Sequence, residues 1–475
     1  MDTARQSIVV GAGPNGLAAA IVLAQSGRAV TVYEAADSIG GGARTAELTL
    51  PGFRHDVCGT VHALAPSSPF LLTLGLERFG LEWVHPDLPL AHPFDDGTAA
   101  VLHRSVEETA HQFEPMDADA YRRLIGPLAA HTDELWDAFL GPLSGAFRHP
   151  VLAARFGLRG LWPAPTLARA RFRSRSARAL LAGNAAHSIV DLREPATSSV
   201  ALMLMLSGHA DGWPFARSGS QALVDAMATL FRQLGGTIVT GQPVRSLRDL
   251  PRDATVVFDL TPRQILTIVG DELPPWYRRQ LGRFRYGASA FKLDWALNGP
   301  IPWTAPDARR AGTVHLGGPM EQIIASEAAL ADGHETERPF VLLTQPSLFD
   351  PTRAPAGKHT AWAYCHVPAG STIDMTARIE AQVERFAPGF RDLIIGRSVM
   401  SPGDFARYNE NYVDGDINGG RQDLRQQFTR PVPRLDPYRT PNPRLFICSA
   451  STPPGGGIHG MAGFHGAQSA LRRRR

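Results

Sequence analysis

The sequence predicts an α/β protein, and the first 35 residues contain the observations that support this. Residues 7–10 form a short apolar run that suits a buried parallel strand, and residues 29–33 (AVTVY) form a second, β-branched run. Between them lie a glycine-rich turn and the Ala- and Leu-rich segment 17–26, which is typical of a helix. Gly27 stands where a glycine commonly ends a helix. The order of strand, turn, helix and strand is that of a parallel crossover unit.

The remainder of the chain divides into a helical stretch and a strand-rich stretch. Residues 70–207 contain long Ala, Leu and Arg segments that predict helices, whereas residues 284–400 alternate as strands and loops do. The glycine-rich turn near the C-terminus predicts a following helix over residues 460–471. Two short β-branched runs, residues 236–240 and 255–260, predict strands that return to the first sheet, and residues 444–449 predict a further buried strand.

The composition is that of an ordinary soluble globular protein. The chain has 475 residues, more than one compact core usually holds, which predicts two domains. The net charge of +3 is too small to indicate a nucleic-acid partner. Cys58, Cys365 and Cys448 form no CxxC pair, so we expect no metal site, no redox dithiol and a reducing, cytoplasmic location. The sequence predicts neither a signal peptide nor a membrane-spanning helix.

The first chemical motif places Gly11, Gly13 and Gly16 between the first strand and the first helix. In a dinucleotide-binding turn, the first glycine permits the tight turn, the second lets the backbone approach a pyrophosphate, and the third allows close packing of helix and strand. The helix N-terminus presents free N–H groups to the phosphates. Glu34, at the end of the second strand, is placed to take ribose hydroxyls. The motif predicts a Rossmann-type site, against the alternative of a glycine-rich turn without a ligand.

The second motif is a run of three glycines, residues 40–42, followed by Ala43 and Arg44. Such a backbone can pass close to an anion, and an arginine beside it can add charge-assisted hydrogen bonds to phosphate. The alternative is a flexible loop with a solvated arginine. Because the motif follows Glu34 so closely, we favour the phosphate interpretation.

The third motif, residues 453–461 (PPGGGIHGM), follows the last predicted strand and opens the last helix. A helix N-terminus again faces the ligand site, now beside bulky apolar residues. Its positive end would suit the electron-rich edge of a reduced flavin. The alternative is a simple turn that begins a helix.

These motifs, in this order, resemble the flavin amine oxidase and phytoene desaturase superfamily, and within it the branch of carotenoid desaturases and carotenoid isomerases. The resemblance is specific at both ends of the chain, VVGAGPNGLAAAIVLAQSG and NPRLFICSASTPPGGGIHGMAGF, and looser between them. It implies an FAD-binding domain assembled from residues 1–70, 216–270 and 420–475. It also implies a substrate domain of sheet and helices, with a helical insert, from residues 71–215 and 271–419.

The resemblance implies roles for individual residues. The backbone of Val244 would meet the adenine, and Lys292 would reach flavin N5 through water, against the alternative of a lysine extending from a strand to solvent. Where many members carry a carboxylate for the ribityl chain, this sequence has Ser449-Ala450. The residues expected to bind FAD are Gly11, Gly13, Pro14, Asn15, Gly16, Glu34, Ala35, Gly41, Gly42, Ala43, Arg44, Val244, Ala450, Gly457, Ile458, His459, Gly460 and Met461.

Candidate residues on the substrate side are His62 and His459, which would act as acid–base groups because histidine titrates near neutrality. For each, a hydrogen-bonded structural histidine is the alternative. The helices between residues 125 and 215 would line an apolar tunnel. Their arginines would rest on anionic lipid headgroups or, alternatively, belong to ordinary amphipathic packing: Arg155, Arg159, Arg169, Arg171, Arg173, Arg175 and Arg178.

Three functions are consistent with the sequence. The first is an FAD-dependent desaturase, dehydrogenase or isomerase that transfers hydride from an apolar, polyene- or isoprenoid-like substrate to flavin N5, with oxygen, a quinone or another carrier as electron acceptor. The second is an amine or amino-acid oxidase, whose aromatic flavin-facing residues the sequence cannot assign among Trp213, Tyr286, Trp295 and Trp303. The third is a non-catalytic binding protein of the same fold, like the GDP-dissociation inhibitors. We expect the first, in the cytoplasm, and peripheral membrane contact stays open beside it.

Overall fold

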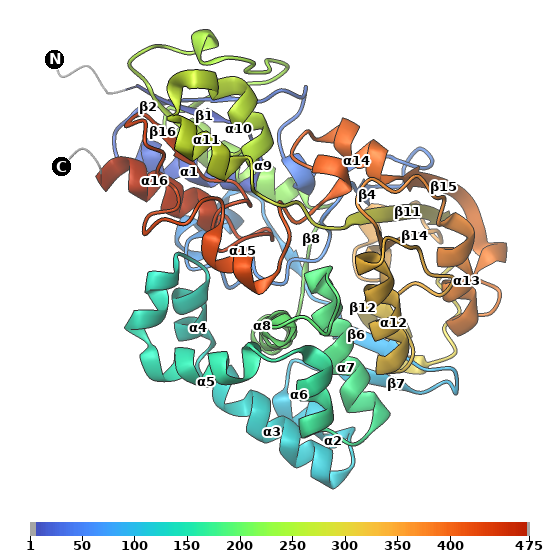
Figure 1. Cartoon of the computed structure of the whole chain (residues 1–475). Coiled ribbons are helices and arrows are strands. Elements are labelled where there is room, and N and C mark those ends of the chain that lie inside the picture. Colours follow the sequence, from blue (N-terminus) through green and yellow to red (C-terminus); the bar gives the residue numbers. More distant parts are fainter. Residues whose placement is uncertain (1–5, 473–475) are drawn as a thin grey trace.

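Two β-sheets organise the chain. One lies beside the two termini, and the other lies on the opposite side of the molecule (Figure 1). The computed structural model describes residues 6–472. Residues 1–5, where the sequence predicted no signal peptide, and residues 473–475 of the terminal arginine run lie outside the described residues.

The first sheet is parallel, with the order β16–β10–β1–β2–β9. The predicted crossover unit and both returning strands are confirmed, and the predicted C-terminal strand forms the edge of this sheet, beside β10. Helices α1 (Pro14–Gln25), α9 (Gln221–Gln233) and α16 (Met461–Arg472) pack against one another, and α10 (Pro262–Val269) and α11 (Pro275–Leu281) belong to a separate core on the other face. The strands are β1 (Gln6–Val10), β2 (Ala29–Tyr33), β9 (Thr237–Val239), β10 (Thr255–Phe258) and β16 (Leu445–Ile447).

The second sheet is mixed, with the order β15–β11–β14–β13–β12–β6–β7 and one parallel pair, β12 with β6. Helix α13 (Thr376–Phe386) covers one face, while α7 (Arg175–Ala185), α8 (Thr197–Ala210) and α12 (Met320–Ala331) lie on the other. The strands are β6 (Leu88–Pro93), β7 (Ala99–Leu102), β11 (Ser289–Leu297), β12 (Ala311–Leu316), β13 (Val341–Thr344), β14 (His359–Val367) and β15 (Ile394–Met400).

The prediction that residues 70–207 are mainly helical is wrong for the hairpin β6–β7. Asp96-Gly97 forms the turn, and Gly97 has a φ of +80°, which favours glycine. The rest of the stretch is helical and forms the lower part of Figure 1. No helix within residues 6–472 is long and apolar enough to cross a membrane. The helices before α7 are α2 (Val106–His111), α3 (Pro115–Ala129), α4 (Thr132–Phe139), α5 (Pro150–Gly160) and α6 (Ala164–Arg171).

The remaining short elements connect these layers. They are β3 (Thr45–Ala46), β4 (His55–Asp56), β5 (Trp83–Val84), β8 (Phe215–Ala216), α14 (Pro402–Tyr408) and α15 (Leu424–Thr429).

A buried ion pair ties β4 to the loop after β13. The Arg353 guanidinium donates to Asp56 at 2.9 Å and to Asp350 at 3.1 Å, and all three side chains are inaccessible to solvent. Asp56 also accepts hydrogen bonds from the Thr45 hydroxyl and the Ser220 N–H. Burial acts to raise the pKa of Asp56, but the Arg353 charge and these hydrogen bonds outweigh it and hold the pKa below its usual value. The pair therefore joins the segments that carry the two halves of the site.

Candidate functional site

A large cavity lies between the two sheets, with a volume of about 1560 Å³. It reaches the carboxyl ends of the first sheet's strands, where open α/β sheets bind ligands. On its other side it is bounded by the second sheet and by α4, α5 and α8. Because a pocket for one drug-sized ligand measures roughly 300–1,000 Å³, this space is large enough for a cofactor and a substrate together.

The first glycine motif forms a cradle that side chains would fill. A Cβ on Gly16 would lie 2.0 Å from the Gly11 carbonyl oxygen, so helix α1 can approach β1 only with glycine at this position. A Cβ on Gly13 would lie 2.9 Å from Asp259 Oδ2. Gly11 has a φ of +102°. These positions match the three glycine roles of a dinucleotide-binding turn.

Glu34 closes this turn from the end of β2. Its Oε2 accepts the Ala12 N–H at 2.8 Å, and its Oε1 accepts the Ala36 N–H at 3.0 Å and an Arg44 N–H at 3.2 Å. A carboxylate has about four acceptor positions, so one remains for a ligand group in the cavity that Glu34 lines.

The second glycine motif packs directly on the first. A Cβ on Gly41 would lie 3.3 Å from Gly13 Cα, and one on Gly42 would lie 2.1 Å from the Tyr412 hydroxyl. The Arg44 guanidinium donates to the carbonyls of Ser38 and Ile39 as well as to Glu34. Arg44 therefore holds the loop in shape, and its contact with phosphate stays a prediction.

Asp259 also belongs to the site, although the sequence motifs did not predict it. It directly follows β10 at the carboxyl edge of the first sheet, and its Oδ2 accepts the Gly16 N–H at 2.9 Å. Burial raises the pKa of Asp259 to about 7, with the hydrogen bond from Gly16 acting in the opposite direction and the Glu34 charge adding to the rise. A carboxyl group that exchanges its proton near neutrality thus lies where the pyrophosphate is expected.

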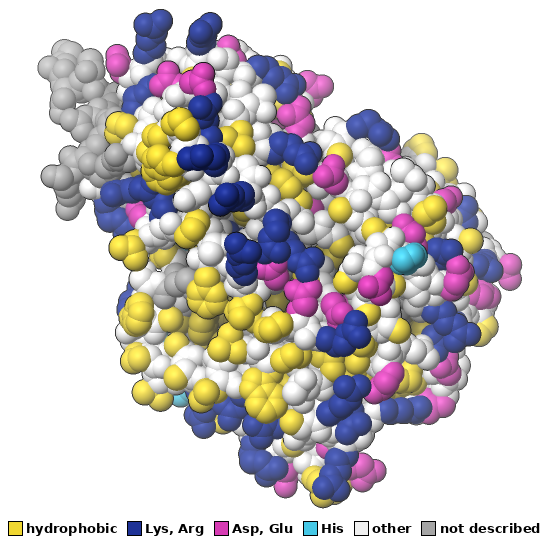
Figure 2. Space-filling model, viewed as in Figure 1, with side chains coloured by type: hydrophobic (Ala, Val, Ile, Leu, Met, Phe, Trp, Pro, Cys, Tyr) yellow, Lys and Arg dark blue, Asp and Glu magenta, His cyan; other side chains and the backbone are white. Residues whose placement is uncertain are grey.

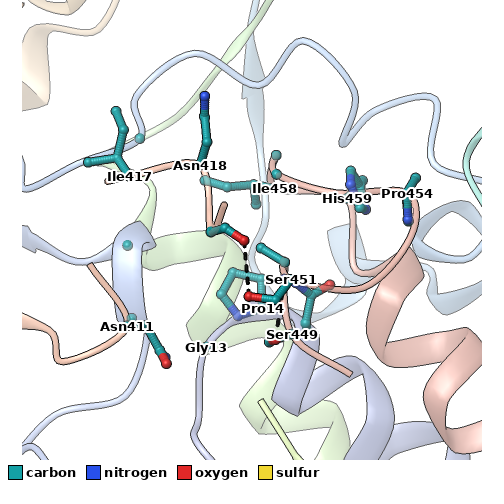
Figure 3. Close-up of a pocket in the computed structure, with 18 of the residues that line it drawn as sticks. Gly13, Pro14, Asn411, Ile417, Asn418, Ser449, Ser451, Pro454, Ile458 and His459 are labelled. Carbon is teal, nitrogen blue, oxygen red and sulfur yellow. Dashed lines mark hydrogen bonds between the residues drawn. The ribbon is translucent and has the colours of Figure 1, made fainter. Parts of the chain in front are cut away.

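The C-terminal motif meets the cradle from the opposite side, and Figure 3 shows Ile458 and His459 across from Gly13 and Pro14. A second missed segment, which includes Asn411, Ile417 and Asn418, completes this wall (Figure 3). The end of this segment, at Gly419, packs against Ser449-Ala450, where the carboxylate of many family members is absent. A Cβ on Gly419 would lie 2.8 Å from Ala450 Cβ. The Ser451 hydroxyl donates to the Gly419 carbonyl at 3.0 Å. Backbone and amide groups thus occupy this part of the site.

Most of the residues expected to bind FAD line the cavity. The exceptions are Gly16, Gly460 and Met461, which support the loops from behind. The cradle, the glycines that a Cβ would fill and the remaining acceptor of Glu34 fit a dinucleotide such as FAD. Lining residues in this set are Gly11, Gly13, Pro14, Asn15, Glu34, Ala35, Gly41, Gly42, Ala43, Arg44, Val244, Ala450, Gly457, Ile458 and His459.

Both predicted histidines line the cavity and are neutral at neutral pH. The His62 Nε2 lies 3.0 Å from the Ser220 hydroxyl, and its ring packs against Trp83 with centroids 5.1 Å apart. The His459 Nδ1 accepts the Met461 N–H at 3.1 Å, which leaves the ring proton on Nε2. Burial lowers the pKa of each histidine to about 4.

Lys292 does not line the cavity. It is buried on β11, forms an ion pair with Asp294, and its Nζ lies 5.4 Å from the centre of the Trp362 ring. Burial raises the pKa of Asp294 to about 6 despite the lysine charge. Trp362 and Tyr364, which are stacked with centroids 5.5 Å apart, form the cavity wall at this point. The predicted reach of Lys292 to a flavin stays a prediction.

The substrate half of the cavity differs sharply in charge from the cofactor half. Among the described lining residues, those from 139–213 and 313–364 include no Asp, Glu, Lys or Arg. Of the four aromatic candidates, Trp213 lines the cavity, whereas Trp295 and Trp303 are in the core on the far face of the second sheet and Tyr286 is not among the lining residues. The large apolar lining side chains are Phe139, Leu140, Phe147, Phe156, Leu161, Met203, Leu204, Trp213, Leu342 and Trp362.

Comparisons with known proteins agree with this architecture. Residues 9–71 match the family model of NAD(P)-binding Rossmann-like domains. The chain is 26% identical to pyridine nucleotide-disulfide oxidoreductase domain-containing protein 2 of Mus musculus, over 98% of this chain and 93% of that protein. It is 25% identical to the lycopene-forming phytoene desaturase of Pseudescherichia vulneris, over 98% and 99% of the two chains.

The solved structure of putrescine oxidase bound to putrescine covers 98% of both chains with a TM-score of 0.64 at 17% identity, a likeness of fold alone. Together, the Rossmann unit and the full-length similarity make the chain similar to phytoene desaturases, and its two-part fold is that of the flavin amine oxidases.

Proposed function

We propose that this oxidoreductase binds FAD in the glycine-lined half of its cavity and oxidises or isomerises an apolar, polyene- or isoprenoid-like molecule held in the other half. FAD would supply the chemistry by accepting hydride at N5. The protein would bind the two molecules against each other and exclude water from the space between them.

The substrate class is inferred from one observation. The described lining residues within 139–213 and 313–364 include no charged side chain. An amine or amino acid would bring an ionised group into this space. Burying such a charge without a counter-charge is strongly unfavourable, so these substrates fit poorly. An uncharged polyene needs only apolar contact, which the aromatic and aliphatic walls offer.

Residues at the junction of the two halves have roles in orienting the substrate. The stacked Trp362 and Tyr364 present an apolar wall, and the Trp362 indole N–H is held by the Thr60 hydroxyl. The neutral His62, fixed by Ser220, adds a polar group without adding a charge. We propose His62 and His459 as residues that orient the reacting groups, since neither holds a titratable proton near neutral pH.

The test is anaerobic reduction of the FAD-loaded protein. Phytoene or a shorter polyene in detergent should bleach the visible flavin absorption, whereas a primary amine or an amino acid should not. Met203→Lys should place a charge in the substrate half and prevent bleaching while the protein stays yellow. Met116→Lys, the same change at an exposed position on α3, serves as the control.

The alternatives predict other outcomes of the same experiment. Bleaching by an amine and not by polyenes would contradict the proposal and favour an amine oxidase, the function of the structurally similar putrescine oxidase. A protein that takes up no flavin and binds an apolar ligand would favour a non-catalytic binding protein. Reoxidation by oxygen and by a soluble quinone, compared after the polyene has reduced the flavin, identifies the electron acceptor.

We also propose that the mouth of the substrate half rests on a membrane surface. Phe147, Val151 and Leu158 are 83%, 82% and 73% exposed on or beside α5, and Phe147 also lines the cavity. Figure 2 shows hydrophobic side chains gathered in the lower left, where α4 and α5 lie, with Lys and Arg side chains below them. Apolar side chains flanked by arginines suit an anionic bilayer.

Vesicle co-sedimentation tests this contact. Anionic vesicles should bind the protein more strongly than neutral ones, and Val151→Asp/Leu158→Asp should abolish binding. Leu435→Asp, at a fully exposed leucine in the loop before β16, should leave binding unchanged. If Leu435→Asp lost as much vesicle binding as the double variant, the membrane contact would lie elsewhere on the protein.

A further inference from the structure

Three hydroxyl groups line the substrate half of the cavity without a hydrogen-bond partner in the described part of the chain. They belong to Ser188, Thr313 and Thr344, whose residues are only 2%, 3% and 2% exposed. Thr313 and Thr344 are register partners on β12 and β13, so their side chains are neighbours on one face of the second sheet. A patch of unpartnered hydroxyls therefore interrupts a wall that is otherwise apolar.

A pair of histidines adjoins this patch. His315 lies two residues after Thr313 on β12, on the same face, and its Nε2 is 3.0 Å from the Nε2 of His187. His187 directly precedes Ser188 and lines the cavity. Burial lowers the pKa of His187 to about 3 and that of His315 well below its usual value, so the pair is uncharged. The patch and its neighbours thus offer hydroxyl and imidazole groups but no charge.

The chemistry of the patch limits what it can bind. A hydrocarbon would leave all three hydroxyls unpaired, which buried hydroxyls rarely are. A carboxylate, phosphate or ammonium would need a counter-charge, and no lining residue from 139–213 or 313–364 supplies one. The described residues also contain no group of three or more His, Cys, Asp or Glu that could hold a metal ion.

We infer that Ser188, Thr313 and Thr344, with His187, bind an uncharged oxygen function, a hydroxyl or carbonyl group, on the substrate. The inference rests on the proposed function and narrows its substrate class from hydrocarbons to oxygenated polyenes or isoprenoids. In sheet register, Trp362 on β14 neighbours Thr344, which neighbours Thr313. One to two strand spacings therefore place the oxygen function about 5–10 Å from the Trp362 wall.

The test compares two ligands that differ in one group. All-trans-retinol and its hydrocarbon analogue, in which a methyl group replaces CH2OH, are titrated into the FAD-loaded full chain. Both polyenes accept energy from tryptophan, so quenching of the emission of Trp213 and Trp362 reports binding without turnover. The wild-type protein should bind the alcohol about ten-fold or more tightly than the hydrocarbon.

Variants assign the preference to the patch. Thr313→Val/Thr344→Val removes two hydroxyls at nearly constant shape and should bind both ligands equally. Thr360→Val is the matched control, because Thr360 is equally buried in the same sheet, also has an unpartnered hydroxyl, and does not line the cavity. It should keep the wild-type preference.

The outcomes separate this inference from the proposed function. Equal binding of both ligands by the wild-type protein, or the same loss of preference in Thr360→Val, would overturn the inference and leave an apolar substrate intact. Binding of neither ligand would overturn the apolar substrate class itself. The comparison in the wild-type protein does not depend on how any variant folds.

Discussion

The two halves of the cavity hold their ligands by different means. The cofactor half is made of backbone: glycines that a Cβ would fill, N–H groups at the start of α1, and carboxyl groups of Glu34 and Asp259 that fix those N–H groups. The substrate half is made of side chains from helices and from the face of the second sheet. A site built from backbone requires glycines at fixed positions in the sequence, whereas a wall of apolar side chains tolerates substitution by other apolar residues.

The largest effect is expected where the two halves are joined. Arg353→Met leaves Asp56 and Asp350 buried without a counter-charge, which should lower the free energy of unfolding by about 3–5 kcal/mol. Urea denaturation of the full chain measures this loss. Arg122→Met breaks exposed ion pairs on α3 and should cost less than about 1 kcal/mol. Similar losses in the two variants would mean that the buried pair does not join the halves.

In the cofactor half, Gly13→Val should weaken FAD binding by at least about 100-fold. The new side chain would meet the Asp259 carboxyl and fill the space the pyrophosphate needs, an overpacking cost of about 1–3 kcal/mol before any lost contact. Fluorescence titration with FAD gives the affinity. A Cβ at Gly126 on α3 would meet nothing within 4 Å, so Gly126→Val should retain the cofactor. A Gly13→Val protein that keeps its full yellow colour would disprove the site.

Asp259 should make cofactor affinity depend on pH. Its pKa in the free protein is raised to about 7, chiefly by burial, and a neighbouring pyrophosphate would raise it further. Above pH 7 the free protein has lost a proton that the complex retains, so FAD affinity should fall by up to about ten-fold per pH unit. Asp259→Asn should remove this slope. A flat wild-type profile between about pH 6.5 and 8.5 would show that Asp259 is not beside the phosphates.

The smallest effect is expected at the junction of flavin and substrate. Lys292→Met should leave FAD bound but slow flavin reduction or reoxidation by about ten-fold or less, since Lys292 does not itself line the cavity. Stopped-flow absorbance measures both rates. Lys292→Met/Asp294→Asn removes the unpaired buried carboxylate that the single variant leaves. Lys358→Met, at the one other lysine, is the control. Unchanged rates would exclude Lys292 from the mechanism.

The difference between the two halves of the cavity also separates what the sequence predicts from what it does not. The five strands of the first sheet and the glycine cradle were predictable, because short apolar runs and fixed glycine spacings are local patterns. The hairpin β6–β7 was missed although Asp96-Gly97 is a strong turn sequence, because the surrounding Ala- and Leu-rich segments dominated the pattern. Asp259 was also within reach, since it lies near the carboxyl end of the predicted strand 255–260, at the edge where ligands bind.

The sequence predicted that helices within residues 125–215 line an apolar cavity, but the hydroxyl and histidine groups of the substrate half were beyond prediction for a physical reason. Thr313, Thr344 and His187 become neighbours only through strand pairing and helix packing, and whether a hydroxyl has a partner is a property of the folded chain. The same holds for Lys292, because its position in β11 does not determine whether its side chain reaches the cavity.

If this cavity holds FAD beside an uncharged substrate, the visible absorption spectrum of the purified full chain should reveal the flavin. We expect a yellow protein with the two absorption bands of an oxidised flavin. Heat should release FAD and not FMN, and anaerobic addition of a polyene should bleach the spectrum. A colourless protein that fails to take up added FAD would contradict the account and would mean that a chain with Ser449-Ala450 in place of the usual carboxylate does not hold the cofactor.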